Sequence, residues 1–225
     1  MTDTTISTIA VLGGAGHEGA GLCARWAKAG YRVVIGSRDA QRSAEAAARI
    51  AERTGGQVEG ATNEDAAARG DLVVLTVPYS AQSPLAESVR PHLEGKILID
   101  VTVPLVPPKV ARVQLPAGGS AVEALQQKLG EGVRVVSAFQ NVAAHQLDDL
   151  DHPVNCDVLV SGDSEAARET VCQLAEAAGM TAWHAGPLAN SAAAEALTSV
   201  LIFMNKRYKI AAGAGIRISG ATPAA

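Results

Sequence analysis

The sequence is poor in aromatic residues and cysteine and has no excess of positive charge. Phe, Trp and Tyr make up only 3% of its 225 residues, whereas 48% are hydrophobic, so Ala, Val, Leu and Gly must fill the core. Small apolar residues favour helices packed tightly on a parallel sheet over an aromatic-rich β-sandwich. The length suits one large domain, or one domain with a small second lobe.

The charge and the cysteines disfavour further classes of protein. A formal net charge of −4 argues against a general nucleic-acid-binding protein. Cys23, Cys156 and Cys172 contain no CxxC pair, and an odd number of scattered thiols is typical of buried free cysteines in a reducing compartment. The sequence contains no signal-peptide pattern and no apolar run of the roughly 20 residues that a membrane span requires. We therefore expect a cytoplasmic protein without nucleic-acid or membrane partners.

Apolar strand patterns and amphipathic helix patterns alternate along the first two thirds of the chain. The predicted strands are 8–14, 31–36, 72–77, 96–101 and 134–138, and the predicted helices are 19–29, 42–54, 63–69, 84–93 and 121–129, with Asn63 as the expected cap of the helix 63–69. This order is typical of an α/β fold with a Rossmann-type, doubly wound parallel sheet that helices cover on both faces. Val103–Pro116 contains four prolines and is expected to be a loop that borders a site.

The pattern changes in the region 141–153. Beyond it we expect strands at 156–161 and 180–184, a helix at 165–178 that Asp163 and Ser164 cap, and a long apolar helix at 191–208. The sequence thus predicts a dinucleotide-binding Rossmann domain over 1–145 and a small C-terminal α/β lobe over 146–225.

A glycine-rich turn follows the first predicted strand. Residues 14–19, Gly-Ala-Gly-His-Glu-Gly, match G-x-G-x-x-G between a strand and a helix, which is the context that this motif requires. Gly14 allows the tight turn, Gly16 lets the backbone approach a pyrophosphate, and Gly19 lets the helix pack closely. The pyrophosphate then meets the positive end of the helix. His17 either contacts the cofactor or faces solvent, and Glu18 is expected to point away from the pyrophosphate.

The end of the second predicted strand selects the dinucleotide. An NAD site has Asp or Glu there, whereas this chain has Ser37 and Arg38, which suit a 2′-phosphate. Asp39 follows and is within reach of a ribose hydroxyl, but we expect it to turn outward or to cap the next helix. We therefore expect NADP(H).

The other predicted strand ends indicate where a second substrate binds. They carry Thr76-Val77-Pro78-Tyr79, Val101–Pro104 and Ala138–Asn141, with no nucleophile–base set or carboxylate pair, so no catalytic side chain is predicted. His145 and His152 flank an acidic stretch at a spacing that suits a metal poorly, and no metal is expected. These features favour hydride transfer that depends on positioning and exclusion of water.

Several segments resemble the coenzyme F420-dependent NADP oxidoreductases. The likeness covers most of the chain, through "VLGGAGHEGAGLCARWAKAGYRVVIGSRD", "LVVLTVPY", "VVSAFQNVAAHQL", "CDVLVSGD" and, most specifically, "AGPLANSAAAEALTSVLIFMNKRYK". The resemblance implies hydride transfer between NADP(H) and F420, an 8-hydroxy-5-deazaflavin. It also implies a homodimer, with the C-terminal lobe contributing to the acceptor cleft and to the dimer.

The resemblance and the motifs together give a set of candidate site residues. For the cofactor they are Gly14, Gly16, His17, Gly19, Ser37, Arg38, Thr76, Val77 and Pro78. For the acceptor they are Gln140, Asn141, Val142 and Leu188, with the deazaflavin ring over the nicotinamide beside Val77 and Pro78. Lys206, Arg207 and Lys209 either attract the anionic tail of F420 or stabilise the helix end.

One departure from the family leaves the acceptor open. Many members carry histidine after the strand where this chain has Phe139-Gln140-Asn141, and such a histidine would touch the deazaflavin. The alternatives are an NADPH-dependent reductase of a flavin, quinone or imine, and a non-catalytic NADPH-binding sensor. The sequence does not set the direction of the reaction.

Overall fold

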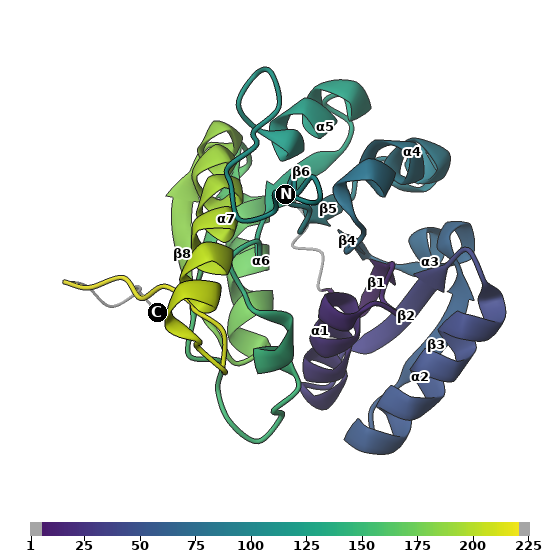
Figure 1. Ribbon diagram of the computed structural model, residues 1–225. Coiled ribbons are helices and arrows are strands. Elements are labelled where there is room, and N and C mark those ends of the chain that lie inside the picture. Colours follow the sequence, from purple (N-terminus) through teal and green to yellow (C-terminus); the bar gives the residue numbers. More distant parts are fainter. Residues whose placement is uncertain (1–5, 221–225) are drawn as a thin grey trace.

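The computed structural model describes residues 6–220, and its framework is an eight-stranded sheet with helices on both faces (Figure 1). The strands lie in the order β3-β2-β1-β4-β5-β6-β7-β8. Their bounds are β1 Thr8–Leu12, β2 Arg32–Ser37, β3 Val58–Thr62, β4 Leu72–Leu75, β5 Ile97–Asp100, β6 Arg134–Ser137, β7 Asp157–Gly162 and β8 Thr181–Gly186. The predicted α/β fold with a doubly wound, mostly parallel sheet is confirmed.

Seven α-helices and three short 3-10 turns accompany the strands in the described residues, and η3 and α7 follow the last strand. The helices are α1 His17–Lys28, α2 Ala40–Thr54, α3 Asn63–Arg69, α4 Tyr79–Val89, α5 Ala121–Leu129, α6 Glu165–Ala177 and α7 Ser191–Tyr208. The 3-10 turns are η1 Arg90–His92, η2 Ala144–Leu147 and η3 Leu188–Asn190. No helix within residues 6–220 combines the length and the hydrophobicity that crossing a membrane would need.

The strands bury both of their faces, as their continuous apolar sequences predict. In β1, Ile9 and Val11 pack with Trp26 of α1 in one hydrophobic core, whereas Ala10 and Leu12 belong to a second core on the other face. Helices α1, α2 and α6 contribute to the first core, and α3, α4 and α5 contribute to the second. Alternate residues of one strand therefore hold two helical layers on a single sheet.

The sheet departs from the expected parallel arrangement at one junction. β7 pairs with β6 in the antiparallel sense, and only through Val136–Gly162 and Ser137–Ser161. The connection from β6 to β7 contains η2 and no crossover α-helix, so the chain returns in the opposite direction. β7 and β8 nevertheless extend the same sheet, and the division of the chain at residue 145 stays a prediction.

Strand β3 and the start of α3 differ from the sequence-based expectations. β3 has the sequence VEGAT, whose half-exposed edge position leaves no apolar run to recognise, and it forms by pairing with β2. Gly60 allows α2 to lie close, because a Cβ there would stand 2.4 Å from the Ala44 nitrogen. Helix α3 is capped by Thr62, whose hydroxyl accepts from the Asp65 N–H at 3.1 Å, and not by Asn63.

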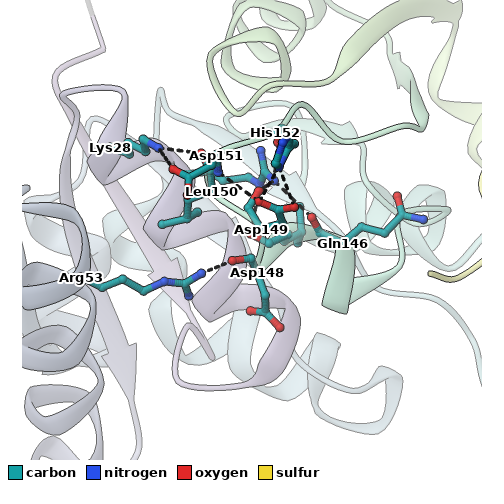
Figure 2. A network of polar contacts seen from close by, with 10 residues as sticks. Lys28, Arg53, Gln146, Asp148, Asp149, Leu150, Asp151 and His152 are labelled. Carbon is teal, nitrogen blue, oxygen red and sulfur yellow. Dashed lines mark hydrogen bonds and ion pairs between the residues drawn. The ribbon is translucent and has the colours of Figure 1, made fainter. Parts of the chain in front are cut away.

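Basic side chains of α1 and α2 hold the loop that follows η2. Arg25 is only 6% exposed, and its guanidinium donates to the backbone carbonyls of Leu147 at 3.1 Å and of Ala178 at 2.9 Å. It also donates to the carbonyls of Gln146, Asp149 and His152. Figure 2 shows how Lys28 reaches the loop at Leu150 and Asp151, and how Arg53 of α2 reaches it at Asp148. These contacts join α1 and α2 to the segment 146–152 and to the end of α6 at Ala178.

We predict that Arg25→Met lowers the free energy of unfolding by about 3 kcal/mol, because buried carbonyls lose a charged donor. Urea denaturation measures the change. Lys28→Met is the matched control, since the Lys28–Asp151 pair is 47% and 86% exposed and such pairs contribute at most about 1 kcal/mol. Equal losses in the two variants would contradict a structural role for the buried guanidinium.

Candidate dinucleotide and acceptor site

A cavity of about 960 Å³ opens at the carboxyl ends of β1, β2 and β4. Three loops form its walls: the glycine turn after β1, the start of α2 after β2, and the turn after β4. Side chains of α3 and α4 complete it. The lining residues are Gly13, Ala15, Gly16, Ser37, Arg38, Arg42, Thr62, Asn63, Glu64, Thr76, Val77, Pro78, Ser80, Ala81, Pro84, Leu85 and Ser88. Ligands of open α/β sheets bind in this position, outside the carboxyl ends of the strands.

The glycine turn brings α1 unusually close to the sheet. A Cβ on Gly19 would lie 2.5 Å from Thr76 Oγ1 and 2.7 Å from the Cα atom of Gly14. A Cβ on Gly14 would lie 2.9 Å from the Val11 carbonyl oxygen. Both glycines thus allow the helix to pack against β1 and β4, which is the role that the motif predicts for Gly19.

The amino end of α1 is open toward the cavity. Gly16 occupies the N-cap position, and no side chain caps the first turn. Gly16 itself lines the cavity, and the first N–H groups of α1 lack intrahelical acceptors. Such an end binds anions through its N–H groups and its dipole, so the turn fits a pyrophosphate.

The start of α2 supplies positive charge to the same cavity. Ser37, Arg38 and Arg42 all line it. Asp39 caps α2, because its Oδ1 accepts from the N–H groups of Gln41 at 3.0 Å and Arg42 at 3.2 Å. The expectation that Asp39 caps this helix is confirmed, which leaves a hydroxyl and two guanidinium groups for a phosphate.

The structure brings most of the predicted cofactor residues together. Gly16, Ser37, Arg38, Thr76, Val77 and Pro78 line the cavity, whereas Gly14 and Gly19 lie behind it as packing positions. His17 is exposed on the first turn of α1 and lies outside the lining.

Among the lining residues that were not predicted from the sequence, Arg42 and Asn63 offer polar groups to a ligand. Arg42 stands four residues after Arg38 at the start of a helix. This spacing is the sequence signal from which Arg42 could have been identified as a second basic residue of the pocket. Asn63 follows β3, the strand that its sequence did not reveal, and its buried Oδ1 has no hydrogen-bond partner among the described residues. That amide oxygen is therefore available to a ligand.

The predicted acceptor residues are buried beyond this cavity. Gln140, Asn141, Val142 and Leu188 are between 1% and 7% exposed, and none of them lines it. The Nε2 atom of Gln140 donates to the Asp100 carbonyl at 2.7 Å, and the Nδ2 atom of Asn141 donates to the Asp157 carbonyl at 2.8 Å. The side-chain oxygens of both amides remain buried without partners among residues 6–220.

Two buried carboxyl groups near these residues are engaged by hydrogen bonds. Burial raises the pKa of Asp100 to about 6, and its Oδ1 accepts from the Thr102 N–H at 2.9 Å. Burial also raises the pKa of Glu195 on α7, which accepts from the N–H groups of Ala121 and Val122 at the start of α5. Both carboxyl groups therefore stabilise chain turns and helix starts.

The described residues contain no cluster of three His, Cys, Asp or Glu side chains that would hold a metal ion. His152 lies 2.9 Å from Asp149 in an exposed ion pair, apart from the cavity. The site therefore combines an open helix start, a pocket with two arginine side chains, and buried amides.

Comparison with known proteins agrees with this geometry. Residues 8–104 match the family model described as NADP oxidoreductase, coenzyme F420-dependent. The F420-dependent NADP reductase of Methanothermobacter thermautotrophicus is 41% identical over 227 residues, covering 97% of each chain. The enzyme of the same name from Methanocaldococcus jannaschii is 41% identical over 94% of this chain and 97% of its own.

A solved structure shows the same fold over the whole chain. A protein of Arthrobacter sp. FB24, proposed to be an F420-dependent NADP reductase, superposes with a TM-score of 0.80 at 24% identity, covering 96% of this chain and 100% of its own. The methanogen enzymes match this chain over nearly its whole length, and the glycine turn and the basic pocket agree with that similarity. The chain belongs to the family of F420-dependent NADP reductases.

Proposed function

We propose that this protein transfers a hydride between NADP(H) and coenzyme F420. The observation that carries the proposal is the cavity in which the open end of α1 faces Ser37, Arg38 and Arg42. A dinucleotide with a 2′-phosphate satisfies both anion-binding parts at once. Similarity to named F420-dependent NADP reductases over nearly the whole chain supports F420 as the second substrate.

Each part of the cavity has a task in binding NADP(H). The N–H groups of α1 bind the pyrophosphate, and Arg38 and Arg42 bind the 2′-phosphate with charge-assisted hydrogen bonds. Thr76, Val77 and Pro78 follow β4 and lie along the path to the nicotinamide. When bound, NADPH supplies the hydride from its nicotinamide ring.

The residues proposed for the acceptor are Gln140, Asn141, Val142 and Leu188. They follow β6 and β8, next to the end of β5, on the side of the site away from α2. Their burial suits a ring that stacks on the nicotinamide in a water-excluding space, where positioning supplies most of the catalysis. The C-terminal part of the chain, from residue 146, contributes to this acceptor cleft.

We predict rapid oxidation of NADPH with F420 as acceptor and little oxidation with flavins, quinones or cyclic imines, because the relatives that are similar over nearly the whole chain are named F420-dependent NADP reductases. Steady-state kinetics with each acceptor measures the ratio. Faster turnover with one of the other acceptors would replace F420 in the proposal. Tight NADPH binding without turnover of any acceptor would favour a sensor.

We predict that Arg38→Ala raises the Kd for NADPH about 10- to 100-fold and leaves the Kd for NADH within about twofold, since only NADPH carries the 2′-phosphate. Isothermal titration calorimetry with both cofactors gives the ratio. Arg49→Ala is the control, because Arg49 is exposed on α2, the helix that follows Arg38, and lies outside the cavity lining. An unchanged NADPH preference in Arg38→Ala would sink the assignment of the 2′-phosphate pocket.

We further propose that the protein is a cytoplasmic homodimer. Helix α7 exposes Val200, Phe203, Met204 and Tyr208, which recur at helical spacing, and Phe203 and Tyr208 are 57% and 68% exposed. The described chain after α7 passes the start of β7, where Ile216 and Ile218 hydrogen-bond with Asp157, and it exposes Ile218. A second copy would cover this apolar surface. The three free, buried cysteines support a reducing compartment.

We predict that Phe203→Glu converts the dimer to a monomer, because it places a charge within the apolar face of α7. Light scattering coupled to size-exclusion chromatography measures the mass. Val106→Glu is the control, since Val106 is 47% exposed in the loop between β5 and α5, away from α7 in sequence. A wild-type monomer, or a Phe203→Glu dimer, would refute an interface on α7.

A further inference from the structure

Glu18 is a half-buried residue within the glycine turn, and its carboxyl group has no task in binding the pyrophosphate. Its Oε1 atom is inaccessible to solvent and has no hydrogen-bond partner among the described residues. Burial raises the pKa of Glu18 to about 8, so the group is a neutral acid at pH 7. A neutral acid does not repel the pyrophosphate beside it, which explains how a glutamate is compatible with this turn.

The position of Glu18 on α1 gives its direction. Residues 18, 21, 22 and 25 share one face of the helix, because they are three, four and seven positions apart. Gly21 on this face packs against Leu147, to which a Cβ would come within 2.5 Å, and Arg25 donates to the Leu147 carbonyl at 3.1 Å. This face of α1 therefore looks toward η2 and the chain that leads into it.

This side of α1 is the nicotinamide side of the site. The 2′-phosphate pocket of Ser37, Arg38 and Arg42 lies toward α2, on the opposite flank of α1. The chain that enters η2 contains Gln140, Asn141 and Val142, at the ends of β5 and β6. A dinucleotide whose pyrophosphate lies at the end of α1 extends its nicotinamide to this flank.

We propose that Glu18 lies beside the nicotinamide and carries the proton of the reaction, as a neutral acid with NADPH and as a carboxylate with NADP⁺. This inference rests on the proposed function. The nicotinamide is uncharged in NADPH and positive in NADP⁺. A buried carboxyl group without other partners responds strongly to that new charge, since an adjacent cation favours the carboxylate.

The step balances in atoms and charge. A hydride leaves the nicotinamide carbon and forms a C–H bond on the acceptor, which gains two electrons while the nicotinamide becomes a cation. The O–H bond of Glu18 breaks, and its proton neutralises the anionic nitrogen of the reduced acceptor. The resulting carboxylate remains beside the cation, and in the reverse direction it takes the proton back.

The other charged or titratable groups that face this region already have partners or are exposed. On α1, on the loop through η2, at the end of β5, at the start of β7 and on α7 they are His17, Arg25, His145, Asp148, Asp149, Asp100, Asp157 and Glu195. Arg25 binds backbone carbonyls, and Asp100 and Glu195 accept from backbone N–H groups. Asp157 accepts from the Trp183 indole and from the Ile218 N–H group. His17, His145, Asp148 and Asp149 are exposed. Glu18 thus combines an inaccessible carboxyl oxygen with no hydrogen-bond partner among the described residues, and its charge is free to follow the cofactor.

Calorimetric titration at pH 7 in two buffers of different ionisation enthalpy tests the proposal, because it counts the protons exchanged on binding. For the wild-type protein we expect NADP⁺ to release about 0.5 to 1 more proton than NADPH, as linkage requires when the pKa of Glu18 falls. The comparison cancels protons exchanged by the 2′-phosphate, which both cofactors carry. Glu18→Gln should abolish this difference, whereas Glu52→Gln, at an exposed site on α2, should retain it.

The outcomes separate this inference from the proposed function. No binding of either cofactor to the wild-type protein would refute the proposed function itself. Tight binding of both cofactors to the wild-type protein with equal proton exchange would overturn only the role of Glu18. This outcome is measured on the wild-type protein alone. A difference that persists in folded Glu18→Gln, verified by circular dichroism, would also overturn it. As the pH rises near 7, the Kd of NADP⁺ should fall by up to tenfold per pH unit in the wild-type protein, and this dependence should be absent in Glu18→Gln.

Discussion

The close contact between α1 and the sheet is the constraint on which the rest of the site depends. Gly19 meets Thr76 and Gly14 at distances that leave no room for a Cβ, so the helix start lies directly over the ends of β1 and β4. Only in this position do its free N–H groups face the cavity. The same helix then carries Arg25 and Trp26, which donate to carbonyls of the C-terminal third, at Ala178 and Leu174. Helix α1 thus positions both the cofactor-binding end of the site and the segments beyond residue 140.

The part of the fold that the sequence predicts well is the part with local signals. The apolar runs of β1, β2 and β4, the glycine turn and the cap at Asp39 each lie within a few neighbouring residues, and each was found. β3 was not predicted, because it becomes a strand only through pairing with β2 at an exposed edge. The antiparallel direction of β7 was not predicted, because it depends on the path of the connection from β6 and not on the residues of the strand.

The site residues also divide into those with a local sequence signal, which were predicted, and those without one, which were not. Ser37 and Arg38 were found from their place after a strand, whereas Asn63 reaches the cavity only through the unrecognised β3. The sequence also could not reveal that the Gln140 and Asn141 side chains donate into the fold, at Asp100 and Asp157, because their partners are 40 and 16 residues away. Burial likewise decides the state of Glu18, which the motif alone treats as a variable position. Asp100 and Glu195 have backbone donors that hold them in place, and Glu18 has none among the described residues.

The antiparallel junction of β6 and β7 gives the two halves of the site different freedom to change. Because Ser137 pairs with Ser161, the start of β7 at Asp157 extends past the end of β6 and stands beside the crevice as a wall. The two strands share only two residue pairs, so the height and spacing of that wall depend on the chain between Ala138 and Cys156. The cavity residues lie on the other flank, between Gly13 and Ser88. The length of this connection therefore bears directly on the acceptor side of the site, whereas it contributes no residue to the lining of the dinucleotide cavity.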